Sequence, residues 1–267
     1  MRIAAQLYTV RDFTNSEMEF AQTLAKIAQI GYREVQLSAV ACMAGDRPLV
    51  SANLAKRMLD DLDLRASLTH RSWEHIANTD SCLEFHAILG AEMVAFGSIP
   101  DSFRSGGLDG YHRFAEAMQG VAKELAAGGL KFAYHNHAFE FERFEMGVRP
   151  FEVLANRTEA FVNFELDTYW VVHAGMDLPK LSNQLSGRIP MIHVKDRAMV
   201  GNEARMAAVG EGNLDWPALI PQFAQSGVEL VAVEQDECYG RDPFDCLCSS
   251  YDYLTKLIRN NCANSPV

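Results

Sequence analysis

This sequence has fewer basic residues than acidic ones. Its 267 residues include 24 Lys and Arg against 35 Asp and Glu, which gives a formal net charge of −11. Binding to a nucleic-acid backbone needs clustered Lys and Arg, so this composition disfavours a nucleic-acid partner. Long apolar runs are also missing, because none approaches the ~20 residues of a membrane-spanning helix, and the N-terminal residues do not form a signal-peptide core. We therefore expect a cytoplasmic protein with no membrane partner.

Paired cysteine motifs are absent as well. The six cysteines are scattered along the chain without a single CxxC pair. In a chain of this length without a signal peptide, such spacing does not indicate a disulfide framework. No cysteine lies in a local pattern that would supply a nearby base, so we expect free thiols and no cysteine nucleophile.

What the sequence does contain is a repeating pattern of strand and helix. Short apolar runs rich in β-branched or aromatic residues recur about every thirty residues, the length of a strand–helix unit, and amphipathic stretches lie between most of them. The expected strands lie near Arg2–Leu7, Arg33–Leu37, Leu64–Thr69, Met93–Gly97, Lys131–His135, Phe161–Leu166, Ile189–His193 and Leu230–Val233.

Eight strand–helix repeats fit either a closed barrel or an open doubly wound sheet. A dinucleotide-binding sheet would carry GxGxxG after its first strand, but residues 8–12 contain no glycine. No linker rich in Pro, Gly or Ser divides the chain, so we predict an α/β fold, a (β/α)8 TIM barrel forming a single domain over residues 1–267.

Thr14–Glu17 has the pattern of a helix capping box, and Asp177 and Asp215 are expected to cap later helices.

In such a barrel the chemistry lies where the strands end at the C-terminal face. Acids and histidines collect at the ends of the last four expected strands. The polar residues that close the strands are Gln6 and Tyr8, Gln36, His70, His135 with His137 and Glu140, Glu165 with Asp167, His193 with Lys195 and Asp196, and Glu234 with Asp236 and Glu237.

Three of these residues suggest a metal site. Asp167, His193 and Glu234 end consecutive strands, and neighbouring strands lie about 5 Å apart, so their side chains can reach one ion. Carboxylate and imidazole ligands together suit a divalent metal such as Mn²⁺, Co²⁺, Zn²⁺ or Mg²⁺. His135 is the natural fourth ligand, and His137 and Glu140 compete with it for that role.

Other polar residues near the strand ends have different expected roles. Lys195 alternates with His193 and would hold an anionic oxygen or take part in proton transfer. Trp170, together with its neighbour Tyr169, could stack on a sugar ring. A separate set, Asp196, Asp236 and Glu237, is expected to cap helices or face solvent.

Five segments together make the chain resemble a known family. They are YHNHAFEF (134–141), FELDTYWVVHAGMD (164–177), HVKD (193–196), VGEGNLDW (209–216) and VEQDE (233–237). The chain is similar to the sugar phosphate isomerase/epimerase family of the xylose isomerase-like TIM-barrel superfamily. That superfamily also holds inosose dehydratases, ketose 3-epimerases and endonuclease IV repair enzymes.

The resemblance implies a metal held by Glu, Asp, His and Glu at the ends of strands five to eight. The matching positions here are His135, Asp167, His193 and Glu234. His135 departs from the family's Glu, which in the epimerases also acts as one of two acid/base residues. Trp170 stands where the epimerases have a substrate-binding His. The HVKD segment, by contrast, is similar to that of inosose dehydratases.

The sequence thus predicts a metal-dependent isomerase or epimerase that acts on a sugar or keto-sugar through an enediolate. The expected partner is a small-molecule sugar or polyol, and a homo-oligomer is left open. Alternatives are an inosose dehydratase-like lyase using the same site, a non-catalytic sugar-binding barrel and an abasic-site endonuclease. The expected catalytic residues are Glu234, His135 and Lys195, and the expected substrate-binding residues are His70, His137, Trp170, Tyr8 and Glu140.

Overall fold

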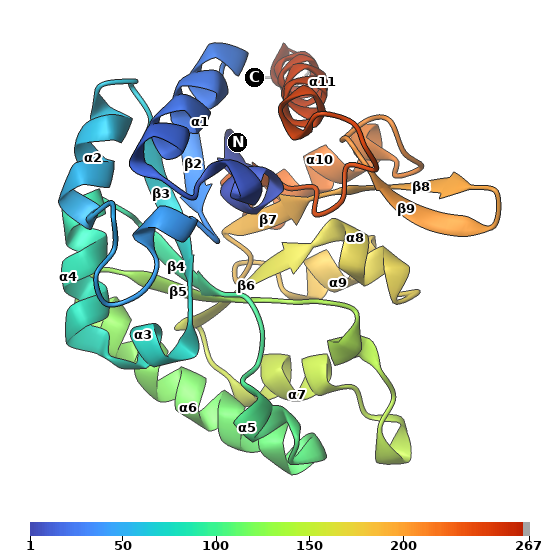
Figure 1. Cartoon of the computed structure of the whole chain (residues 1–267). Helices are drawn as coiled ribbons and strands as arrows, with labels where there is room; N and C mark the ends of the chain where they lie inside the picture. Colours follow the sequence, from blue (N-terminus) through green and yellow to red (C-terminus); the bar gives the residue numbers. More distant parts are fainter. Residues whose placement is uncertain (264–267) are drawn as a thin grey trace.

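The computed structural model describes residues 1–263, and its centre is a closed barrel of parallel strands (Figure 1). Around the barrel the strands follow the order β1-β10-β7-β6-β5-β4-β3-β2. Each strand therefore pairs with its sequence neighbours, with β10 closing against β1, and the predicted (β/α)8 fold is confirmed. The barrel strands are β1 (Arg2–Gln6), β2 (Glu34–Leu37), β3 (Arg65–Arg71), β4 (Met93–Phe96), β5 (Lys131–His135), β6 (Val162–Asp167), β7 (Met191–Val194) and β10 (Leu230–Val233).

Helices cover the outside of the barrel (Figure 1). Asp177 and Asp215 accept hydrogen bonds from the backbone N–H groups of residues 180 and 218, so both predicted caps are confirmed. The expected box at Thr14–Glu17 is wrong by two residues, since Ser16 caps the first helix and Glu19 closes the box. The helices are α1 (Glu17–Ile30), α2 (Ala52–Asp60), α3 (Trp73–Ala77), α4 (Thr79–Leu89), α5 (Asp101–Arg104), α6 (Gly107–Ala127), α7 (Pro150–Arg157), α8 (Thr168–His173), α9 (Leu178–Gln184), α10 (Trp216–Gln225) and α11 (Pro243–Ala263). Within residues 1–263, no helix combines the length and the apolar character needed to cross a bilayer.

An antiparallel hairpin that the sequence pattern did not predict projects from the barrel between β7 and α10 (Figure 1). It consists of β8 (Asp196–Val200) and β9 (Glu203–Ala207). At its base, the buried Asp196 carboxylate accepts hydrogen bonds from the Trp216 indole and from the backbone N–H groups of residues 197, 210, 212 and 214. The expectation that Asp196 caps a helix or faces solvent is therefore wrong.

Strand register sets which polar side chains become neighbours at the barrel mouth. His135 on β5 is paired with Glu165 on β6, and Asp167 on β6 is paired with His193 on β7. Because side chains at i and i+2 share one face of a strand, Glu165 and Asp167 point to the same side of β6 at two depths. A separate apolar cluster, half of it alanine, consists of Ala4, Leu68, Met93, Ala95, Ala133, Met191, Leu230 and Ala232.

Candidate active site at the barrel mouth

A cavity of about 290 Å³ opens at the C-terminal ends of the strands. This is close to the lower end of the usual size range for small-molecule pockets, ~300 Å³. Its walls are polar, and most of the residues come directly after or from the ends of strands. They are Gln6, Tyr8, Ser38, Ala39, His70, Gly97, Ser98, His135, His137, Lys195, Glu234 and Asp236.

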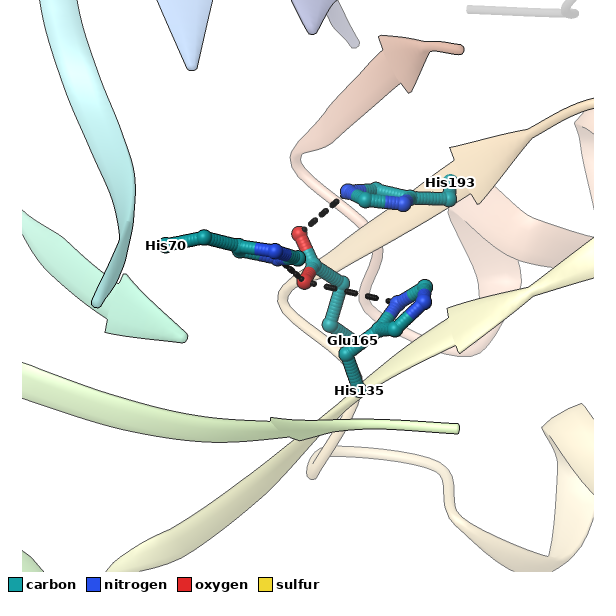
Figure 2. A group of neighbouring side chains, drawn as sticks. All are labelled: His70, His135, Glu165 and His193. Carbon is teal, nitrogen blue, oxygen red and sulfur yellow. Dashed lines mark hydrogen bonds and ion pairs between the residues drawn. The ribbon is translucent and has the colours of Figure 1, made fainter. Parts of the chain in front are cut away.

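Three histidines meet around the Glu165 carboxylate near this cavity (Figure 2). We call these four residues the histidine cluster: His70, His135, Glu165 and His193. One ligand atom from each lies within 4.8 Å of the others. The Glu165 carboxylate is fully buried and contacts His70 Nε2, while its Oε1 lies 2.8 Å from His193 Nε2. Gln36 donates from Nε2 to the same Oε1 at 2.7 Å.

His135 has a ring nitrogen with no hydrogen-bond partner, as His193 does at Nδ1. The His135 Nδ1 is buried and lies 3.6 Å from Glu165 Oε2, which is too long for a hydrogen bond. Burial, and then the charge of His193, holds the pKa of His135 well below its ordinary value. The neutral imidazole is the form that binds metal, so His135 already offers a free ligand atom, whereas His193 would have to give up its proton to an ion. Three imidazoles and one carboxylate are a donor set that fits a divalent ion.

A second group, which we call the lysine cluster, consists of Asp167, Lys195, Glu234 and Asp236. Lys195 Nζ lies 3.0 Å from Asp167 Oδ2, 2.6 Å from Glu234 Oε2 and 2.8 Å from Asp236 Oδ1. The expectation that Asp236 caps a helix or faces solvent is therefore wrong. Burial opposes the charge on Lys195, but the three carboxylates outweigh it and raise its pKa well above the ordinary value.

His193 connects the two clusters because each of its ring nitrogens faces one of them. Nε2 faces Glu165, whereas Nδ1 lies 2.8 Å from Glu234 Oε2 and 3.8 Å from Asp167 Oδ2. Burial alone would lower the pKa of His193, but the carboxylates of Glu165 and Glu234 raise it to about 10.

The four expected metal ligands therefore do not form a single group. Asp167, His193 and Glu234 offer atoms within 4.8 Å of one another, while His135 belongs to the histidine cluster. The sequence reasoning listed Glu165 among the strand-end residues but gave it no role, since Asp167 was taken as the ligand from that strand. The signal at Glu165 was a carboxylate inside an apolar strand, a position that is rarely tolerated unless the charge has partners.

The expected substrate-binding residues divide into two sets. Tyr8, His70 and His137 line the cavity, but Trp170 and Glu140 do not. The Trp170 ring lies next to two lining residues, with its centre 5.7 Å from that of the His137 ring and 5.7 Å from Lys195 Nζ. Burial, and then the nearby Lys195 charge, lowers the pKa of His137 to about 4, so this cavity residue is neutral at pH 7.

Glu140 is fully buried and supports the loop that follows β5. Its Oε1 accepts a hydrogen bond from the Tyr134 hydroxyl at 2.7 Å, and its Oε2 accepts one from the His137 backbone N–H at 2.8 Å. Burial raises the pKa of Glu140 from 4.5 to about 7.

That shift predicts a pH-dependent stability. Because the folded pKa is raised, the contribution of Glu140 to stability is present below about pH 4.5 and is lost as the pH rises through about 7. Glu140→Gln removes this titration, so between about pH 5 and pH 7.5 the wild type should lose ~1–3 kcal/mol more unfolding free energy than the variant. Urea unfolding at both pH values measures the difference. Glu142→Gln, at an exposed acid, is the control, and parallel losses in all three proteins would contradict the assignment.

A third cluster, His75, Cys82 and His86, lies away from the cavity on α3 and α4. Both nitrogens of His86 are already engaged, Nε2 with Thr69 Oγ1 at 2.7 Å and Nδ1 with the Cys82 carbonyl at 2.6 Å. Burial raises the pKa of the Cys82 thiol to about 11, which disfavours the thiolate that a metal needs. This cluster is therefore a structural one.

The comparisons with known proteins agree with the fold. The family model described as xylose isomerase-like TIM barrel matches residues 24–243. The chain belongs to this family. Among curated proteins, none matches the chain.

Solved structures of several other proteins superpose over nearly the whole chain. A sugar phosphate isomerase/epimerase from Parabacteroides distasonis ATCC 8503 is 22% identical, covers 95% of this chain and 93% of its own, and gives a TM-score of 0.78. An L-ribulose 3-epimerase is 15% identical, with 99% and 98% coverage and a TM-score of 0.71. The IOLI protein with a binding zinc atom is 14% identical, with 97% and 99% coverage and a TM-score of 0.71. At these identities the likeness establishes the fold alone.

Proposed function

We propose that this xylose isomerase-like barrel is a metal-assisted isomerase or epimerase of a sugar or keto-sugar. The observation that carries the proposal is the convergence of four acids, four histidines and one lysine at a single cavity mouth. Such a set can remove a proton from the carbon beside a carbonyl and return it on another face or another carbon. Relatives of the same fold that are described as isomerases and epimerases agree with this reaction class.

Glu234 is the residue best placed to move the proton. It lines the cavity, and Gln6 Nε2 donates to its Oε1 at 2.8 Å, while Oε2 faces Lys195 and His193. Burial would raise the pKa of Glu234, but Lys195 and His193 lower it below its ordinary range, so the carboxylate is ionised and can accept a proton. His135 is the alternative base, since it also lines the cavity.

Lys195, His70 and His137 would hold the substrate oxygens. All three line the cavity, and the Lys195 ammonium can stabilise negative charge that develops on an oxygen. A divalent ion bound at the barrel mouth would polarise the carbonyl as a Lewis acid. The zinc atom of the IOLI protein supports this choice of cofactor.

A lyase using the same residues is the second candidate. If a hydroxyl group leaves the carbon next to the one deprotonated, the reaction is a dehydration instead of an epimerisation. Such a step needs an acid near the leaving group, and Lys195 Nζ, 2.6 Å from Glu234, supplies an ammonium at the cavity wall.

Solvent-deuterium incorporation into ketoses and keto-inositols tests the proposal. With Mn²⁺ or Co²⁺ added, we expect deuterium to enter the carbon beside the carbonyl of at least one compound and the product to keep its mass apart from the label. Loss of water from the product would instead select the lyase. Absence of exchange across a broad panel, with the metal demonstrably bound, would overturn both.

A further inference from the structure

The barrel mouth offers two places for a cation, and they differ in what already occupies them. The lysine cluster surrounds an ammonium group, which cannot act as a metal ligand while it is protonated. The histidine cluster contains no Lys or Arg side chain, and its His193 ring can bind an ion in the neutral form. His193 is shared, with Nδ1 toward the first and Nε2 toward the second.

In the lysine cluster the cation is Lys195 itself. Its Nζ is within 3.0 Å of Asp167, Glu234 and Asp236. A divalent ion bound to Asp167 and Glu234 would have to share the same two oxygens with the ammonium, and two cations that close repel strongly in a buried site. One of them must therefore leave.

The ammonium is not free to leave. The Lys195 backbone is fixed at both its N–H and its carbonyl by the Thr168 hydroxyl, at 2.9 and 2.8 Å. The Lys195 side chain is only 2% exposed, and the Trp170 ring lies 5.7 Å from Nζ. Moving the ammonium away would also leave three carboxylates facing one another without a counter-charge.

The histidine cluster has the opposite character. His70, His135 and His193 bring imidazole nitrogens around the Glu165 carboxylate, a mixed donor set that suits Zn²⁺ or Co²⁺ (Figure 2). His135 Nδ1, buried and without a hydrogen-bond partner, faces this carboxylate from 3.6 Å. A buried polar atom left unsatisfied is costly, and a bound ion would satisfy it.

We propose that the divalent ion binds at His70, His135, Glu165 and His193, and that the Lys195 ammonium fills the cation position between Asp167 and Glu234. The assignment deepens the proposed function, on which it rests for the presence of a metal, by locating that ion. It also gives Lys195 a role that no metal-ligand pattern predicts, as a resident cation that balances the charge of the three surrounding carboxylates and blocks a second ion.

Metal binding tests the assignment without any substrate. Metal-free protein is titrated with Co²⁺ by calorimetry, with the visible absorption of the bound ion as a second readout. We expect one equivalent in the wild type, at least about tenfold weaker binding in Glu165→Gln and in His135→Asn, and binding within about threefold of wild type in Asp167→Asn. Asp167→Asn is the matched control, because it changes a carboxylate to an amide in the other cluster.

Lys195→Met should open the second position, so that two equivalents of Co²⁺ bind. Lys195→Arg keeps the cation and should still bind one. Thermal unfolding shows whether each variant is folded. If Glu165→Gln does not fold, His135→Asn still tests the assignment, because His135 Nδ1 has no hydrogen-bond partner to lose.

Three results would overturn the assignment: wild-type protein that binds no Co²⁺, binding that is lost in Asp167→Asn but kept in His135→Asn, or a single equivalent in folded Lys195→Met. Failure of the proposed function looks different, since it would leave the metal bound as described and the loaded protein without exchange activity on any sugar.

Discussion

Glu234→Gln should lower the rate of substrate deprotonation by about 10²- to 10⁴-fold, the usual contribution of a positioned general base. In the wild type, Gln6 Nε2 donates a hydrogen bond to Glu234 Oε1 at 2.8 Å. The amide keeps the size of the side chain and can still accept this hydrogen bond, but it cannot take a proton. The measurement is the rate of solvent-deuterium incorporation in the metal-loaded protein.

Glu237→Gln is the matched control for this prediction. Glu237 follows the same strand only three residues later and is exposed, so its replacement should leave the exchange rate within about twofold of wild type. An equal loss in both variants, or a Glu234→Gln protein that exchanges at the wild-type rate, would remove Glu234 from the mechanism.

Asp196→Ala should have the largest effect on stability, lowering the free energy of unfolding by more than about 3 kcal/mol. The buried carboxylate accepts hydrogen bonds from four backbone N–H groups and from the Trp216 indole, whose Nε1 lies 2.6 Å from Oδ2. Alanine would leave these donors without an acceptor and would release the base of the β8–β9 hairpin directly beside Lys195.

Urea unfolding measures this effect, and Asp215→Ala is the control. Asp215 accepts a single hydrogen bond, from the backbone N–H of residue 218 at 3.3 Å, so its loss should cost only about 1 kcal/mol. Similar losses in the two variants would show that the Asp196 network is not a structural centre of the C-terminal half.

The barrel could be predicted from the sequence because its signals are local. Buried parallel strands read as short apolar runs, and helices between them carry caps such as Asp177 and Asp215. The β8–β9 hairpin was not predicted, because its strands are only partly buried and interrupt the strand–helix repeat. Asp196 was misassigned for a different reason: most of its hydrogen-bond donors lie more than ten residues further along the chain.

The sequence predicted where several site residues lie, but not which of their side chains contact one another. Strand-end reasoning placed Asp167, His193 and Glu234 within reach of one another, as the structure does. It could not predict that Glu165, two residues before Asp167 on the same face of β6, is the carboxylate that His70 and His135 surround, because that depends on the register between β5 and β6. The pairing of Lys195 with Asp236 likewise depends on a loop conformation that no periodicity encodes.

The mouth of this barrel is proposed to be a metal centre, with its ion among the histidines. Crystals soaked with Zn²⁺ or Co²⁺ and measured at the metal's absorption edge test it most directly. We expect one anomalous peak within bonding distance of Glu165, His135 and His193, with Lys195 still between Asp167 and Glu234. A peak between those two acids with Lys195 displaced, or no peak at the mouth at all, would contradict it.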